Sequence, residues 1–288
     1  MKIGVSSYSF QQYINAGKMT QLDAVEKAKK IGFDAIEFTD LTPHDGSTNK
    51  EYAKKIASKA KECGIEITCY AVGANMVCET EKEYKAQIDA LKERLDEAAI
   101  LGVGLFRHDA TFDLKSVRSF DMALPQIAKG IREVTEYAQT LGIKTMVENH
   151  GFICQDSDRV ERLFNAVNHE NFGLLVDMGN FTCVDENPAT AVSRLARYAF
   201  HAHAKDMLMI PFDGNIETYG YFNTRACNKL RGTIIGQGIV PVKQCIAILK
   251  SQGYDGTLSL EYEGGDDCII GIETGFRNLK SYIEELEA

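Results

Sequence analysis

Four residues of the kinds that bind metal ions each end a separate apolar stretch of this sequence. They are Glu148 in TMVENHG, Asp177 in FGLLVDMGN, His203 in FHAHAKD and Glu261 in LSLEYEG. Burying an unpaired carboxylate costs several kcal/mol, so such a side chain is normally neutralised or finds a partner. If the four stretches are parallel strands, their equivalent ends bring these side chains to one point. The simplest common partner for three carboxylates and one imidazole is a divalent cation such as Mn²⁺, Mg²⁺, Co²⁺ or Zn²⁺.

The elements that position these residues are indicated by a recurring pattern: an amphipathic helical stretch, a glycine, and then an apolar run of β type. Gly32 and Gly64 stand at two of these junctions. Glycine just past a helix adopts the left-handed conformation that closes the last turn, and a strand that starts soon after is typical of an αβ connection. The pattern predicts strands at Ile3–Tyr8, Ala35–Thr39, Ile65–Ala71, Gly104–His108, Thr145–Glu148, Gly173–Asp177, Ala199–Ala204 and Thr257–Glu261. The predicted helices are Thr20–Ile31, Asn49–Cys63, Glu81–Leu101, Ser116–Leu141, Ser157–Val167, Pro188–Tyr198, Pro241–Gln252 and Gly271–Leu286.

Eight alternating units without a composition break predict an α/β fold, a single (β/α)8 TIM barrel over residues 1–288. The alternative is an open doubly wound sheet, but no glycine-rich phosphate loop follows the first predicted strand. Helix starts are marked by Ser157 as a predicted N-cap and by first-turn prolines at Pro188 and Pro241. The connection at about 207–240 lacks a helical period, and we expect it to be a long βα loop over the mouth of the barrel.

The composition is that of an ordinary globular protein, with 44% hydrophobic and 25% charged residues. The net charge of −9 argues against a nucleic-acid phosphate backbone as the main partner. We expect a cytoplasmic protein without a membrane partner, because the N-terminus shows no signal peptide and no apolar stretch approaches the roughly 20 residues that span a bilayer. The eight cysteines contain no CxxC pair and predict reduced thiols rather than a disulfide framework.

Two segments carry a resemblance to a known family. HAHAKD is similar to a His-x-Lys-Asp strand end, and GQGIVPVKQCIAILKSQGYDGTLSLEYEG is similar to a GxG turn, a helix, a GYDG turn and a Glu-ending strand. Together they resemble the xylose isomerase-like TIM barrels, the sugar phosphate isomerase/epimerase group, and the resemblance covers nearly the whole chain. It implies one divalent metal ion, with Mn²⁺ the first choice, held by Glu148, Asp177, His203 and Glu261.

The resemblance also implies the chemistry of the site. A metal ion that chelates a carbonyl oxygen and the adjacent hydroxyl acidifies the C–H between them and stabilises the enediolate. In the similar epimerases the glutamates that end strands five and eight remove and return the proton, and here these are Glu148 and Glu261. The implied function is a divalent-metal-dependent isomerase or epimerase of a small sugar or sugar derivative.

Departures from the ketose 3-epimerases support a second hypothesis. Cys154, Asn180 and Met209 replace a glutamate, a substrate-binding histidine and an arginine of those enzymes. In compensation, His150 lies two residues after Glu148 on the same face of an extended segment and is a candidate catalytic base. The alternative function is therefore a metal-dependent lyase or dehydratase on keto-sugars, resembling inosose dehydratases or the barrel subunits of C-glycoside deglycosidases.

Other residues are candidates for binding the small carbohydrate substrate. Lys205 shares a face with His203, with an ion pair to Asp206 as its alternative role, and His201 is either a support for the site or a hydrogen-bonded core residue. The predicted substrate-binding residues are His108, Lys205, Arg231, Asn180 and Glu37. A homo-oligomer or a second subunit is expected as a protein partner. An abasic-site endonuclease is disfavoured because no Asp-x-His motif occurs, and a non-catalytic sugar-binding barrel is disfavoured by the intact glutamate pair.

Overall fold

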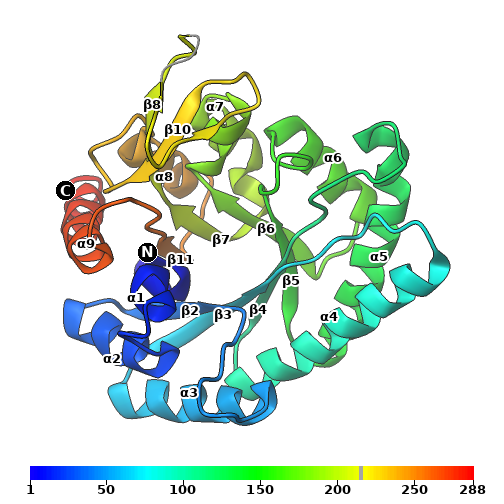
Figure 1. Cartoon of the computed structure of the whole chain (residues 1–288), viewed down its shortest axis with the longest axis horizontal. Helices are drawn as coiled ribbons and strands as arrows, with labels where there is room; N and C mark the ends of the chain where they lie inside the picture. Colours follow the sequence, from blue (N-terminus) through cyan, green and yellow to red (C-terminus); the bar gives the residue numbers. More distant parts are fainter. Residues whose placement is uncertain (214–216) are drawn as a thin grey trace.

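The computed structural model describes residues 1–213 and 217–288. Eight parallel strands close into a barrel in the order β1-β11-β7-β6-β5-β4-β3-β2, with helices around the outside (Figure 1). This confirms the predicted single (β/α)8 barrel. The barrel strands are β1 (Lys2–Ser6), β2 (Ala35–Thr39), β3 (Glu66–Val72), β4 (Leu105–His108), β5 (Lys144–Glu148), β6 (Phe172–Asp177), β7 (Ala199–Ala204) and β11 (Thr257–Leu260).

The helices start and end at residues that satisfy their free backbone groups. Three of them begin with a threonine N-cap and an acidic residue three positions later, the reciprocal arrangement called a capping box, and each of these ends at a glycine in the left-handed conformation. The helices are α1 (Gln11–Asn15), α2 (Gln21–Ile31), α3 (Asn49–Cys63), α4 (Glu81–Leu101), α5 (Phe120–Thr140), α6 (Ser157–Val167), α7 (Pro188–Leu195), α8 (Val242–Ser251) and α9 (Cys268–Glu285). Short 3₁₀ turns lie at η1 (Ser7–Phe10), η2 (Asn180–Val184) and η3 (Ala196–Tyr198).

Several predicted boundaries differ from the structure. The first strand ends at Ser6 because the Ser6 hydroxyl accepts a hydrogen bond from the Tyr8 N–H and opens the η1 turn. The prediction of Ser157 as an N-cap is wrong: Asp156 caps α6, while Ser157 is bound to Glu186. Pro188 does occupy the first turn of α7, as predicted.

The connection between β7 and α8 is more regular than predicted. It contains a three-stranded antiparallel sheet in the order β8-β10-β9, formed by β8 (Asp206–Ile210), β9 (Phe222–Asn223) and β10 (Lys229–Thr233). Residues 214–216 of the predicted loop lie outside the described residues. Figure 1 shows β8 and β10 at the edge of the barrel. None of the connection's described residues lines the central cavity. The placement of this connection over the mouth stays a prediction.

The side chains inside the barrel change from apolar to polar toward the carboxyl ends of the strands. A small apolar cluster of Cys69, Met146 and Leu175, at most 1% exposed, fills part of it. Polar side chains follow toward the carboxyl ends of the strands, including Glu37, His201 and His203, all at most 2% exposed. Since a buried polar group costs free energy unless it is paired, this layer marks where the site lies.

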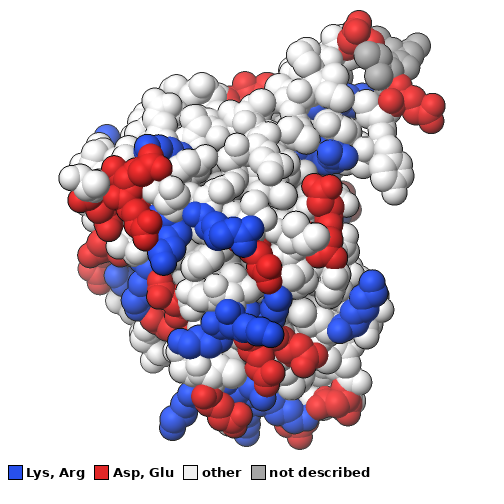
Figure 2. Space-filling view, turned by 90° about the vertical axis from the view of Figure 1, so that its left-hand side faces the viewer, with Lys and Arg blue, Asp and Glu red and all other residues white. Residues whose placement is uncertain are grey.

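The outer surface carries charges of both signs. On the face shown in Figure 2, lysines and arginines are interspersed with aspartates and glutamates, and they form no continuous basic surface there. Among the described residues, no helix has both the length and the apolar character needed to cross a bilayer.

Candidate active site and metal centre

The four predicted ligands come together at the carboxyl ends of neighbouring strands. Glu148 ends β5, Asp177 ends β6, His203 lies in β7, and Glu261 directly follows β11. One ligand atom from each of the four lies within 4.8 Å of the corresponding atoms of the other three, and all four residues are buried. The register explains this, because Asp177 pairs with His203 and Ser259 pairs with His203 on the other side.

The donor atoms fit a divalent cation. Nδ1 of His203 lies 3.5 Å from Oδ2 of Asp177 and 3.6 Å from Oε2 of Glu261, too far for short hydrogen bonds. Both that Nδ1 and the Asp177 Oδ2 are buried without a hydrogen-bond partner among the described residues. The other oxygen of Asp177 accepts from the N–H groups of Gly179 and Asn180 at 2.7 and 2.9 Å. Three hard carboxylates and one imidazole are a donor set that suits Mn²⁺, Mg²⁺, Co²⁺ or Zn²⁺.

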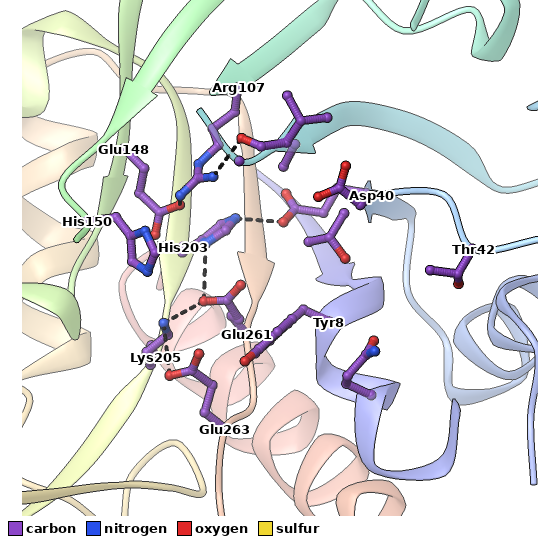
Figure 3. Close-up of a pocket in the computed structure, with 16 residues that line it drawn as sticks. Tyr8, Asp40, Thr42, Arg107, Glu148, His150, His203, Lys205, Glu261 and Glu263 are labelled. Atoms are coloured by element: carbon purple, nitrogen blue, oxygen red, sulfur yellow. Dashed lines mark hydrogen bonds and ion pairs between the residues drawn. The ribbon is translucent and has the colours of Figure 1, made fainter. Parts of the chain in front are cut away.

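Lys205 brings a positive charge to the edge of this cluster. Its Nζ lies 2.5 Å from Glu261 Oε2 and 3.2 Å from Glu263 Oε2 (Figure 3). It also lies 3.3 Å from Asp177 Oδ2. Burial lowers the pKa of Lys205, but the neighbouring carboxylates outweigh burial and hold the pKa well above its ordinary value. The alternative pairing of Lys205 with Asp206 is wrong, because the Asp206 carboxylate accepts backbone N–H groups of the β7–α8 connection instead.

Sequence reasoning missed the part played by Arg107. Its Nη2 lies 2.6 Å from Glu148 Oε2 and 2.8 Å from Asp109 Oδ1, and its side chain is 9% exposed. Asn180 donates from Nδ2 to the other oxygen of Glu148 at 2.7 Å, so both oxygens of that carboxylate are held. A signal for Arg107 did exist: a charged residue inside the apolar strand LFRHD needs buried partners.

His150 and Asp109 form a second pair at the cavity. His150 Nδ1 lies 2.9 Å from Asp109 Oδ1, and the imidazole meets the ring of Phe112 edge-on at 5.6 Å between centroids. Burial lowers the pKa of His150, but the hydrogen bond with Asp109 and the charge of Glu148 outweigh it and raise the pKa above its ordinary value. The pair thus places a proton carrier beside Glu148.

The central cavity has a volume of about 330 Å³ and opens at the carboxyl ends of the strands. Of the predicted substrate-binding residues, Lys205 and Glu37 line it, together with all the predicted catalytic and metal residues except Asp177. Asn180 lies behind Glu148, and Lys205 donates to its Oδ1 at 3.1 Å. Glu263, two residues after Glu261 and therefore on the same face, was also missed. Polar residues on the open side are Tyr8, Gln11, Thr39, Asp40 and Thr42.

Two predicted substrate-binding residues lie elsewhere. His108 is fully buried, its Nδ1 bonded to the Asp109 carbonyl at 2.9 Å, because alternation along β4 turns Arg107 toward the cavity and His108 away from it. Arg231 lies on β10 with its guanidinium 5.0 Å from the ring centroid of Tyr221. Neither residue lines the cavity.

Known proteins share this fold. Residues 25–287 match the family described as xylose isomerase-like TIM barrels. The chain belongs to this family. It is 24% identical to an inosose dehydratase of Lacticaseibacillus casei over 139 residues, which are 48% of this chain and only 46% of that protein.

Two further similarities extend over more of the chain. A D-psicose 3-epimerase of Enterocloster bolteae is 20% identical over 206 residues, covering 67% of this chain and 68% of that protein. A xylose isomerase-like barrel protein from Mycobacterium smegmatis, solved in complex with magnesium, superposes with a TM-score of 0.72 at 17% identity over 99% of this chain and 97% of that one. At this identity the structural likeness concerns the fold.

Proposed function

We propose that this protein is a divalent-metal-dependent isomerase or epimerase of a small sugar or sugar derivative. The observation that carries the proposal is the convergence of Glu148, Asp177, His203 and Glu261 ligand atoms within 4.8 Å at the mouth of the barrel. The names of the relatives, an inosose dehydratase and a D-psicose 3-epimerase, support a keto-sugar or a related polyol as the substrate class.

The four residues would hold one cation, with Mn²⁺ the first choice. When bound, such an ion polarises a carbonyl and the adjacent hydroxyl, which acidifies the C–H between them and favours the negative charge that develops on the oxygens. The cavity of about 330 Å³ is of a size that takes a monosaccharide. Lys205 and Arg107 hold the surrounding carboxylates in place.

The proton is moved by the two glutamates. Glu148 is oriented through hydrogen bonds donated by Arg107 and Asn180, and Glu261 is oriented by Lys205 on the other side of the cluster. One carboxylate takes the proton from carbon. Delivery of a proton by the other carboxylate to the opposite face of the same carbon gives an epimer. Delivery to the neighbouring carbon, with loss of the enediol hydroxyl proton as the new carbonyl forms, gives an isomer.

A second function, a metal-dependent lyase or dehydratase, is favoured by the His150–Asp109 pair. In an elimination, one carboxylate takes the α proton, the electron pair forms the C=C bond, and the C–O bond at the β carbon breaks. His150 in its protonated form would donate its proton to the departing hydroxyl, which leaves as water. In the C-glycoside deglycosidase variant the C–C bond between the β carbon and the aglycone breaks instead, and the protonated His150 would donate its proton to the departing aglycone.

The two functions are separated by one assay. The Mn²⁺-loaded protein is incubated in D₂O with ketohexoses, inososes and 3-keto-glycosides. Epimerisation or isomerisation gives a deuterated sugar of unchanged composition, whereas elimination gives an ultraviolet-absorbing enone or a released aglycone. Glu148→Gln should abolish either reaction, and Glu97→Gln, a buried glutamate bonded to Tyr70 and Arg94 away from the cavity, serves as the control. A protein that binds no divalent metal would refute both functions.

A further inference from the structure

One carboxylate at the floor of the cavity connects two histidines of the same strand. His201 and His203 alternate along β7, so both point into the barrel. Glu37 reaches them from β2, on the other side of β1 and β11. His201 Nε2 lies 2.6 Å from Glu37 Oε2, and His203 Nε2 lies 2.7 Å from Glu37 Oε1.

This geometry leaves Glu37 little capacity to bind a sugar hydroxyl. Its side chain is 0% exposed, and each of its two oxygens already faces an imidazole nitrogen. Glu37 Oε2 is hydrogen-bonded to His201 Nε2, and Glu37 Oε1 is in 2.7 Å contact with His203 Nε2, so both oxygens are already occupied by imidazoles.

The consequence for His203 follows from the tautomers of imidazole. When Nε2 carries the proton that is donated to Glu37, Nδ1 is left with its lone pair free. That Nδ1 faces Asp177 Oδ2 at 3.5 Å and Glu261 Oε2 at 3.6 Å, and no described residue hydrogen-bonds to it. The Glu37 carboxylate beside Nε2 thus favours the tautomer of His203 that carries its proton on Nε2. It also orients the ring so that the free Nδ1 points to the other predicted metal ligands.

We propose that Glu37 is a positioning residue for the metal ligand His203, and that His201 holds Glu37 in place. The proposal rests on the proposed metal-dependent function. His201 Nε2 holds Glu37 Oε2 at 2.6 Å. The Ser259 hydroxyl lies 3.1 Å from the same Nε2 atom. The chain His201–Glu37–His203 therefore runs from the middle of the barrel to the ligand cluster.

The test is metal binding to the full chain rather than turnover. Glu37→Gln keeps the volume but replaces one oxygen by an N–H₂ donor, which cannot face an imidazole N–H. The imidazole opposite the amide nitrogen must then carry its proton on Nδ1 or lose its hydrogen bond. We expect Mn²⁺ affinity in titration calorimetry to fall about 10- to 100-fold. At saturating Co²⁺, the visible absorption spectrum should shift, because the orientation and basicity of the imidazole change.

Glu97→Gln is the matched control, since Glu97 is a buried glutamate that accepts from Tyr70 at 2.9 Å and Arg94 at 3.0 Å on α4. It should leave both the affinity and the Co²⁺ spectrum unchanged. If Glu37→Gln does not fold, His201→Phe decides, with an expected loss of affinity of at least about threefold because Glu37 loses its second donor.

The outcomes distinguish this proposal from the proposed function. A wild-type chain that binds neither Mn²⁺ nor Co²⁺ overturns both. A wild-type chain that binds metal, together with a Glu37→Gln variant of the same affinity and the same Co²⁺ spectrum, overturns the positioning role and leaves the metal site intact.

Discussion

Replacing Arg107 by methionine is expected to destabilise the metal-free protein by about 3–5 kcal/mol, the cost of removing one partner of a buried ion pair. The Arg107 guanidinium lies 2.6 Å from Glu148 Oε2, 2.8 Å from Asp109 Oδ1 and 3.2 Å from the Val72 carbonyl oxygen. Methionine fills similar apolar volume but leaves Glu148 buried without its cation, while Asp109 keeps its contact with His150 at 2.9 Å. Asn180 still donates to Glu148, so we expect the lower half of that range.

Thermal unfolding in EDTA measures this loss. About 2–4 °C per kcal/mol applies to domains slightly smaller than this one, so a loss of about 3–4 kcal/mol should lower the melting temperature by about 6–16 °C. Adding Mn²⁺ should reduce the drop, because the cation compensates the charge of Glu148. The double variant Arg107→Met/Glu148→Gln should regain part of the stability by removing the stranded charge.

Arg225→Met provides the control, because Arg225 forms an exposed ion pair with Asp156 at 3.0 Å, and such pairs contribute about 0–1 kcal/mol. A drop for Arg107→Met no larger than that of Arg225→Met would refute the reasoning. So would a double variant less stable than the single one, since the stranded carboxylate would then not be the cause.

Three further predictions concern the metal, acid stability and a tight turn. Asp177→Asn should lower Mn²⁺ affinity at least about 100-fold in titration calorimetry, while near-wild-type affinity would exclude Asp177 as a ligand. Burial lowers the folded-state pKa of His108 from 6.5 to about 4, so the unfolded chain takes up a proton first as the pH falls. The folded state therefore loses about 3 kcal/mol between pH 6.5 and pH 4, and His108→Gln should abolish that part of the loss in urea unfolding at the two pH values. Gly238→Ala should destabilise the protein by about 1–3 kcal/mol. The new Cβ would lie 2.3 Å from the Met207 carbonyl oxygen and 2.2 Å from Asp206 Oδ1, which is too close without a shift of the backbone. Urea unfolding measures the loss, and an unchanged midpoint would contradict the prediction.

The barrel and the ligand cluster were within reach of the sequence because both depend on local patterns. Strands and helices are encoded by periodicity, caps and glycines within about ten residues of one another. Since the carboxyl ends of parallel strands share one side of a barrel, a residue type at the end of a strand already implies its position. Glu148, Asp177, His203 and Glu261 could therefore be grouped without coordinates, and the structure brings them together.

The regular structure in the connection after β7 was harder to predict. β8 and β10 pair across the connection, with Arg231 opposite Leu208 and Thr233 opposite Asp206. The run MLMIPFDGN gives no clear alternation, and pairing of such a ribbon depends on the register of two segments rather than on either one alone. The sequence could state that the connection was long, but not that it would fold beside the barrel.

The sequence by itself determined the order of the elements and the chemical types at the strand ends. Only the tertiary structure decided which charges meet. Glu37 and His201 are 164 positions apart in the chain, and they come into contact only because the barrel closes. The pairing of β4 with β5 sets Arg107 against Glu148, and alternation along β4 turns His108 away from the cavity. Such pairings follow from distances across the barrel and from competition among buried charges for the same partners, and neither is written in any local stretch of the sequence.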